Sequence, residues 1–231
     1  TDLFGLGLLR YYAGVYVGEG RSAERVGDLR QMYLGRVEVL PLGLFEDYSE
    51  VDFERALRPR VSIGAAYAYL ASAERNRGIV GERPSDRGTT DYHNATLDLM
   101  LKVAGFSMIS EFYYRTGTRN PGPIRDEAGE PIRDEVGRPL VIEGARNGAG
   151  WFVQAGYLLP GSRFEIAGRV GAFGPLGEGS SMERRGEVGG GLNYYFARHP
   201  LKLQTDLFQE LRGASLADGA VRARVQLQVS L

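Results

Sequence analysis

Apolar and polar residues alternate one by one along most of the chain. The clearest example lies between Asn147 and Phe173. One parity holds Trp151, Val153, Ala155, Tyr157 and Leu159, and the other holds Phe152, Gln154 and Gly156. The alternation breaks at 159–162 (Leu-Pro-Gly-Ser) and then resumes. Because successive side chains of a strand point to opposite faces, this stretch predicts a tight hairpin with one apolar face and one face of charges and glycines.

Ten segments follow this period of two. Each is close to the roughly ten residues that a tilted strand needs to cross a bilayer. The predicted strands lie at 10–17, 32–40, 61–69, 94–103, 106–115, 151–159, 163–172, 187–196, 201–207 and 221–231. The pattern therefore predicts an all-β chain.

The connections between these segments alternate between long and short. The long, polar ones are expected near 71–91, 116–148, 174–185 and 211–219, and the short ones at 104–105, 159–162 and 197–200. Residues 41–59 are the exception, because this long connection falls on the short-turn side. Long loops at one end and short turns at the other are typical of outer-membrane barrels. The chain is thus expected to form a single domain, 1–231, a transmembrane antiparallel β-barrel with ten visible strands.

Aromatic residues on the apolar parity sort into two groups along the predicted strand axis. One group lies beside the short turns and the other nearer the long loops, as expected where aromatic rings meet lipid headgroups. The members are Phe106, Tyr157, Phe164, Tyr194 and Phe196 on the turn side, and Tyr67, Tyr69, Phe112, Tyr114 and Trp151 on the loop side. Ordinary cross-strand pairing in a soluble sheet is the alternative explanation.

Composition narrows the possible functions. The 231 residues include 33 Gly and 13 Tyr but no Cys, which excludes disulfides, thiolate metal sites and thiol nucleophiles. The formal net charge of −1 argues against a broadly basic nucleic-acid binder. No stretch has the ~18 uncharged, apolar residues of a membrane helix. The sequence predicts no cofactor and no metal site.

Charges gather on the parity opposite the apolar face, and bases outnumber acids there. The bases are Arg10, Arg30, Arg36, Lys102, Arg115, Arg163, Arg169, Lys202, Arg222 and Arg224, and the acids are Glu38, Asp98, Glu111, Glu165, Glu187 and Asp206. A basic, water-filled lumen attracts anions. The expected anion pathway is Arg36, Lys102, Arg115, Arg163, Arg169, Lys202, Arg222 and Arg224. The alternative is a closed barrel filled by mutually paired charges, such as Arg163 with Glu165 or Arg115 with Glu111.

Signals for catalysis are few, and the chain is not expected to be an enzyme. Asp91 and His93 form the one acid–histidine neighbour pair, at the loop end of a predicted strand, where an outer-membrane hydrolase would place one. No serine, phosphate-binding or dinucleotide motif accompanies them. The loop at 122–139 holds a tandem repeat, PIRDEAGE and PIRDEVGR, read either as a solvated hairpin or as a loop that constricts a pore.

The order and spacing of several short motifs resemble the phosphate-selective porin O and P family over nearly the whole chain. These are YYAGVYVGEG (11–20), RVSIGAAYAY (60–69), GWFVQAGYLLP (150–160), FEIAGRV (164–170), GGGLNYYF (189–196), HPLKLQTD (199–206) and RARVQLQV (222–229). The resemblance implies an outer-membrane barrel of roughly sixteen strands, usually trimeric, that passes anions such as phosphate. The ten segments would correspond to its C-terminal strands. The family's lysine-rich anion site draws largely on parts that this sequence does not match, so its residues are not carried over, and Leu231 stands where such barrels usually end in an aromatic residue.

Pattern and resemblance together predict a porin in the outer membrane of a Gram-negative bacterium, a passive channel that prefers small, phosphate-like anions. Its partners would be the lipid bilayer, small anions and a homotrimer or other envelope proteins, but no nucleic acid. Ten strands can also close into a narrow barrel with little lumen. The chain would then be a non-conducting structural or partner-binding barrel in an envelope complex.

Overall fold

The structure, a computed structural model, describes residues 7–17, 31–45, 47–122, 132–137, 143–213 and 219–230. These residues form ten β-strands and contain no helix. The strands are β1 (Leu9–Val17), β2 (Gln31–Val39), β3 (Arg60–Ala73), β4 (Thr89–Val103), β5 (Phe106–Asn120), β6 (Gly148–Leu158), β7 (Phe164–Pro175), β8 (Arg185–Tyr195), β9 (Leu201–Arg212) and β10 (Val221–Val229). The prediction of ten strands is confirmed.

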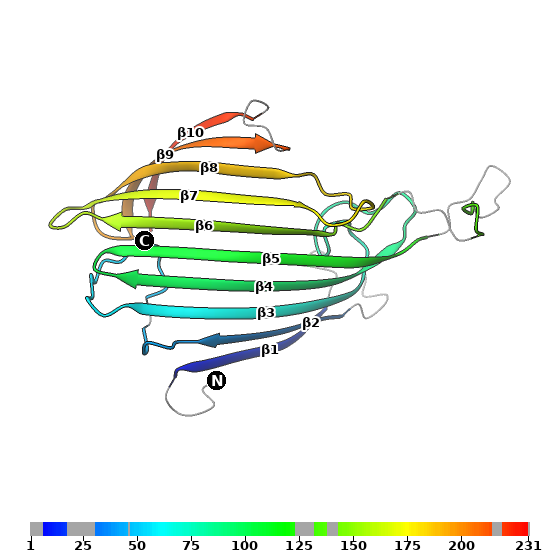
Figure 1. Ribbon diagram of the computed structural model, residues 1–231, viewed down its shortest axis with the longest axis horizontal. Helices are drawn as coiled ribbons and strands as arrows, with labels where there is room; N and C mark the ends of the chain where they lie inside the picture. Colours follow the sequence, from blue (N-terminus) through cyan, green and yellow to red (C-terminus); the bar gives the residue numbers. More distant parts are fainter. Residues whose placement is uncertain are drawn as a thin grey trace.

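All ten strands belong to one antiparallel sheet in which each strand pairs with its neighbours in the sequence, from β1 to β10 (Figure 1). Within the described ranges β1 pairs with β2 alone and β10 with β9 alone. The sheet is therefore open, with β1 and β10 as its edges, and the closed barrel expected from the sequence is not formed by these strands.

The strands β3, β4 and β5 are longer than the sequence pattern predicts, with 14, 15 and 15 residues. Pairing continues into the stretches expected as loops, because β4 begins at Thr89 and β5 ends at Asn120. Polar residues in these extensions interrupt the alternation of apolar and polar positions, but the backbone pairing between β4 and β5 continues through them. A buried ion pair between Asp86 and Arg119 and the buried ring of Tyr92 hold the extended ends together.

Tight turns connect strands at the opposite end of the sheet, which we call the turn side; the end with the long loops is the loop side. Between β4 and β5 the turn consists of Ala104 and Gly105, with φ values of +52° and +92°. Two positive φ angles in a row match a two-residue hairpin turn whose twist suits the flanking strands, and glycine adopts such an angle without a Cβ penalty.

The two faces of the sheet differ as the alternation predicts. One face, here the apolar face, presents large hydrophobic side chains that remain exposed, such as Leu97 at 57 %, Ile166 at 57 % and Val225 at 74 %. The opposite face, here the charged face, carries the ion pairs described below. Exposed large hydrophobic side chains of this parity lie on all ten strands, which is more than the surface of a soluble monomer normally carries.

Burial concentrates at the two ends of the sheet. On the loop side Leu70, Ala73, Tyr92 and Ala145 form one small cluster. On the turn side Val51, Leu158 and Tyr195 form another, against which Phe53 packs. Among the described residues, no apolar core lies on the charged face in the middle of the sheet.

The turn-side cluster depends on the connection between β2 and β3, residues 41–59, which we call the inner segment. It is described except for residue 46 and has no helix or strand of its own. Hydrogen bonds and packing place its middle portion on the charged face, and it leaves that face beside the turn at 104–105, where Ala104 N donates to Ala56 O over 2.9 Å.

Candidate functional site

The charged face is the inner side of a curved sheet, since its side chains meet across strands that are not neighbours. Arg36 on β2 donates to the Asp98 carboxylate on β4, with an Nη2–Oδ2 distance of 2.9 Å. Gly64 on β3 lies between them, and a Cβ at this position would overlap both groups. Glycine at 64 therefore allows the ion pair to pass over the intervening strand.

A second network of charges occupies the same face between β7 and β10. Arg169 Nε lies 2.9 Å from Glu187 Oε1. Arg222 bridges Glu187 and Glu210, at 3.6 and 2.9 Å. Glu187 and Glu210 are directly opposite in the β8–β9 register, so the guanidinium of Arg222 offsets the repulsion between like charges.

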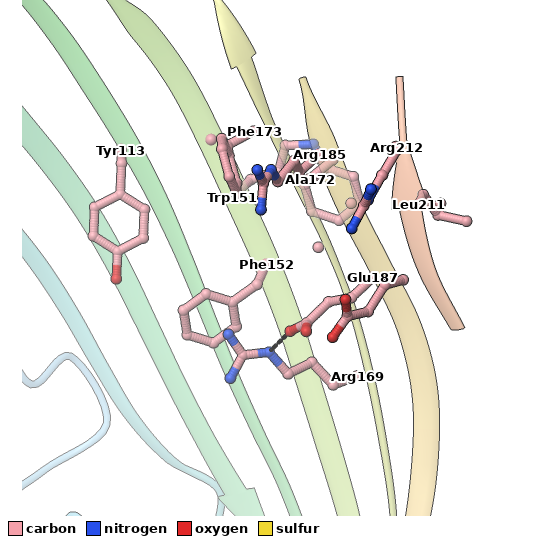
Figure 2. Close-up of a pocket in the computed structure, with 14 residues that line it drawn as sticks. Tyr113, Trp151, Phe152, Arg169, Ala172, Phe173, Arg185, Glu187, Leu211 and Arg212 are labelled. Atoms are coloured by element: carbon pink, nitrogen blue, oxygen red, sulfur yellow. Dashed lines mark ion pairs between the residues drawn. The ribbon is translucent and has the colours of Figure 1, made fainter. Parts of the chain in front are cut away.

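A cleft of about 410 Å³ opens beside this network (Figure 2). Its wall combines aromatic rings with guanidinium groups. Phe152 lies beneath Arg169, whose Cζ is 4.2 Å from the ring centroid, and Tyr113 borders the cleft from β5. Arg185 and Arg212 lie on its loop-side rim.

These two rim arginines are cross-strand partners in the register of β8 and β9. Arg185 pairs with Glu183 at 2.7 Å, and the guanidinium of Arg185 lowers the pKa of the Glu183 carboxyl. Arg212 forms no ion pair with any residue of the described ranges. Among the described residues these two guanidinium groups share one ion pair, so they leave a local positive charge that a small anion would offset.

The turn side of the charged face is built differently, because the inner segment covers it. Lys102 on β4 is fully buried beneath this segment. Its ammonium donates to Asp47 O, Ser49 Oγ and Val51 O over 2.9, 3.3 and 3.1 Å, and it lies 3.0 Å from Asp47 Oδ2. Burial raises the pKa of Asp47, but hydrogen bonds from Ser49 and Lys102 outweigh this and lower it overall.

Further contacts fix both halves of the inner segment. The Tyr48 hydroxyl donates to Glu38 on β2 over 2.5 Å and accepts from Arg10 on β1 over 2.7 Å. Burial, together with the hydrogen bond to Glu38, raises the pKa of Tyr48 to about 12. Asp52, fully buried, accepts from Gly105 N over 2.8 Å and pairs with Arg60.

The eight residues predicted to line an anion pathway all lie on or beside the charged face, but most are neutralised. Arg36, Arg169, Arg222 and Arg224 pair with acids, and Lys102 is covered by the inner segment. Arg115 donates to Asn94 and lies over the Tyr92 ring. Arg163 donates to Phe196 O at a turn, and Lys202 has no ion pair among the described residues.

Pairing of charges, the alternative expected from the sequence, is thus common, although the partners differ from those suggested. Glu165 accepts from Tyr195 and Asn193 rather than from Arg163, and Glu111 makes no ion pair with a described residue. Arg30 and most of the tandem repeat lie outside the described residues.

Sequence reasoning missed the residues that shape the two ends of this face. Arg185, Glu210 and Arg212 share the parity of the predicted inward residues, so extending the alternation of β8 and β9 would have found them. The acidic residues of the inner segment do not lie in a strand, so the alternation of strand side chains gave no indication of where they point. No local signal indicated that Asp47 and Asp52 fold back over Lys102 and Arg60.

Asp91 and His93 lie on the apolar face and do not bond to each other. Asp91 accepts from Ser72 N and from Asn120 Nδ2, at 2.6 and 3.1 Å. His93 Nδ1 contacts the Tyr67 hydroxyl. This arrangement lacks the acid–histidine contact that a hydrolytic site would use.

The described part of the chain contains no group of three or more His, Cys, Asp or Glu side chains arranged to hold a metal ion. Nor does it contain a helix long and apolar enough to cross a membrane.

Comparison with known proteins gives no relative on which to rest an assignment. No protein-family model matches the chain, and neither a curated protein nor a solved structure shows significant similarity to it.

Proposed function

We propose that the chain forms part of the wall of an outer-membrane β-barrel channel that passes small hydrophilic solutes passively and favours anions. The apolar face would contact lipid, and the charged face would line water. The long loops would lie outside the cell and the short turns in the periplasm.

One observation carries this proposal: the apolar face stays exposed across the sheet while charged groups occupy the opposite face. In water such an exposed face costs free energy at roughly 25 cal/mol per Å² of apolar surface. In a bilayer the same surface is the favoured one, and every strand, with 9 to 15 residues, reaches the ~9–11 residues that a tilted membrane strand needs. The open edges at β1 and β10 would need further strands beside them, since unpaired backbone groups are costly in lipid.

Preference for anions rests on the rim of the cleft rather than on the whole wall. Arg36, Arg169, Arg222 and Arg224 are paired, so they contribute little net field. Arg212 faces Arg185 and has no ion pair with a described residue, so it would supply most of the charge that attracts anions. A guanidinium at a narrow, low-dielectric wall raises the local concentration of anions.

Recording from the purified, folded protein in a planar lipid bilayer tests the proposal. Under a potassium chloride gradient we expect discrete conductance steps and a reversal potential of the sign for chloride selectivity. Arg212→Gln should move the reversal potential toward cations, whereas Arg87→Gln, an equal loss of charge at an exposed position of the loop between β3 and β4, should not. Absence of conductance from folded protein would contradict the proposal.

A second candidate is favoured by the inner segment. Because this segment lies over the charged face and neutralises Lys102 and Arg60, the same structure suits a non-conducting barrel that serves as a structural partner in an envelope complex. The recording separates the two: a folded, bilayer-inserted protein that never conducts is the result this second function predicts.

A further inference from the structure

The inner segment is held on the charged face by contacts that extend over most of the sheet. On one side Tyr48 reaches Arg10 of β1. On the other side Phe53 packs edge-on against Tyr195 at the end of β8 and against His199 in the following turn, with centroid distances of 4.8 and 4.9 Å. A single connection between β2 and β3 therefore spans the turn-side opening from β1 to beyond β8.

The middle of the segment wraps around one ammonium group. Two carbonyl oxygens, one hydroxyl and one carboxylate, all from residues 47–51, surround the Nζ of Lys102. These acceptors converge from a stretch without regular secondary structure, so their own backbone bonds do not fix their positions. Lys102 supplies the donors that do, and a buried ammonium without them would be strongly unfavourable.

The exit of the segment is fixed as well. Arg55 donates to Leu158 O at the end of β6, and its guanidinium lies 5.7 Å from the Tyr157 ring centroid. Asp52 accepts from Gly105 N in the β4–β5 turn. The segment thus crosses the turn-side opening. It is held by contacts to β1 at one end, to Lys102 in its middle and to the end of β8 at the other end.

We propose that the inner segment is a built-in constriction of the turn-side mouth, with Lys102 as its central anchor, and that it sets the size of the solutes that pass. The inference rests on the proposed channel function and adds the element that limits passage. Release of the segment would widen the mouth without altering the strands of the wall.

Lys102→Met tests the anchor, because it keeps the length of the side chain but removes the ammonium. We expect the Arg55–Ala56 bond of the folded variant to be cut by trypsin about tenfold faster or more, because the segment opens more often. Single-channel conductance should rise, and larger uncharged solutes should enter vesicles that carry the protein. Arg87→Met removes an equal charge from the exposed loop between β3 and β4 and should change none of these quantities.

Phe53→Ala provides a second test that leaves Lys102 in place, and it decides the matter if Lys102→Met does not fold. It should release the far end and also speed cleavage at Arg55. Unchanged cleavage in both variants would overturn the anchoring. Faster cleavage with unchanged conductance would overturn the role as a constriction. Folded wild-type protein that never conducts would overturn the proposed channel function instead, while faster cleavage of the variants would still support the anchored segment.

Discussion

The two ends of the charged face hold their charges in opposite ways. On the turn side Lys102, Asp52 and Glu38 are buried, and each has several partners supplied by the inner segment or by neighbouring strands. In the cleft on the loop side Arg169 and Glu187 remain 37 % and 29 % exposed, and Arg212 has no ion pair with a described residue.

Under the proposed channel function, this difference would separate charges that hold structure from charges that act on solutes. A buried, multiply bonded ion is costly to disturb but creates little field in the lumen, because its partners neutralise it. A half-exposed guanidinium contributes little to stability, yet in a channel it would act on passing ions. The sign of a charge on the wall is therefore a poor guide to its role until its partners are known.

The largest expected effect separates two acids that share Arg60. Asp52 is fully buried, whereas the Glu54 side chain is 59 % exposed, and both pair with Arg60. Asp52→Ala should lower the free energy of unfolding by about 3–5 kcal/mol, since it leaves Gly105 N and Arg60 without a buried acceptor. Glu54→Ala should cost about 0–1 kcal/mol. Denaturant unfolding in lipid vesicles measures both, and equal costs would show that the inner segment is not held through Asp52.

The next effect tests the two faces in the middle of β4. Leu97 lies on the apolar face and Thr96 on the charged face. Leu97→Arg should destabilise the bilayer-inserted protein by about 2–4 kcal/mol, because the guanidinium would enter lipid. Thr96→Arg should cost less, since its side chain would reach water. The same unfolding assay compares them, and a Leu97→Arg variant as stable as Thr96→Arg would argue against a lipid-facing sheet.

A smaller change in stability is expected in the cleft. Glu187→Gln removes the acid shared by Arg169 and Arg222, which should cost about 1 kcal/mol or less because the pair is partly exposed. The same change should shift the reversal potential toward chloride. Glu178→Gln, an equal charge change in the loop after β7, is the control. A shift of the same size in both variants would show that the cleft has no special influence.

The smallest effect concerns pH. Burial, together with the nearby Lys202, lowers the pKa of His199, whose ring packs against Phe53. The unfolded chain therefore binds a proton at His199 more readily than the folded chain does. The contribution of the neutral His199 ring to the stability of the fold is complete above about pH 6.5 and declines as the pH falls below that value. Asp47, Glu50 and Lys102 also contribute to the electrostatic field at this ring.

Amide hydrogen exchange of the inner segment, corrected for intrinsic rates, should therefore show faster opening at pH 5 than at pH 7.5. His199→Phe should remove that difference. Below about pH 3.8, protonation of Asp47 should weaken the segment further, because the folded form lowers the pKa of this carboxyl. Exchange that does not change with pH in the wild-type protein would exclude His199 from the contact.

Local alternation predicted the strands well, because the period of two survives in a short window of sequence. It placed Arg36 and Asp98 on the same face, yet it did not predict their ion pair, which forms across β3 and depends on curvature and on the missing Cβ of Gly64. The inner segment was recognised only as a connection of unexpected length. Its position depends on the three-dimensional arrangement of Lys102, Gly105 and Tyr195, which no local pattern reveals.

The alternation along β6 offers the most direct test of the central claim, that one face of the sheet meets lipid and the other lines water. Since the chain has no cysteine, single cysteines at positions 151 to 157 are unique labels. In bilayers, we expect a water-soluble thiol reagent to modify cysteines at 152 and 154 and a lipid-dissolved reagent to modify those at 151, 153 and 155. Equal modification of both parities by the water-soluble reagent would contradict the account.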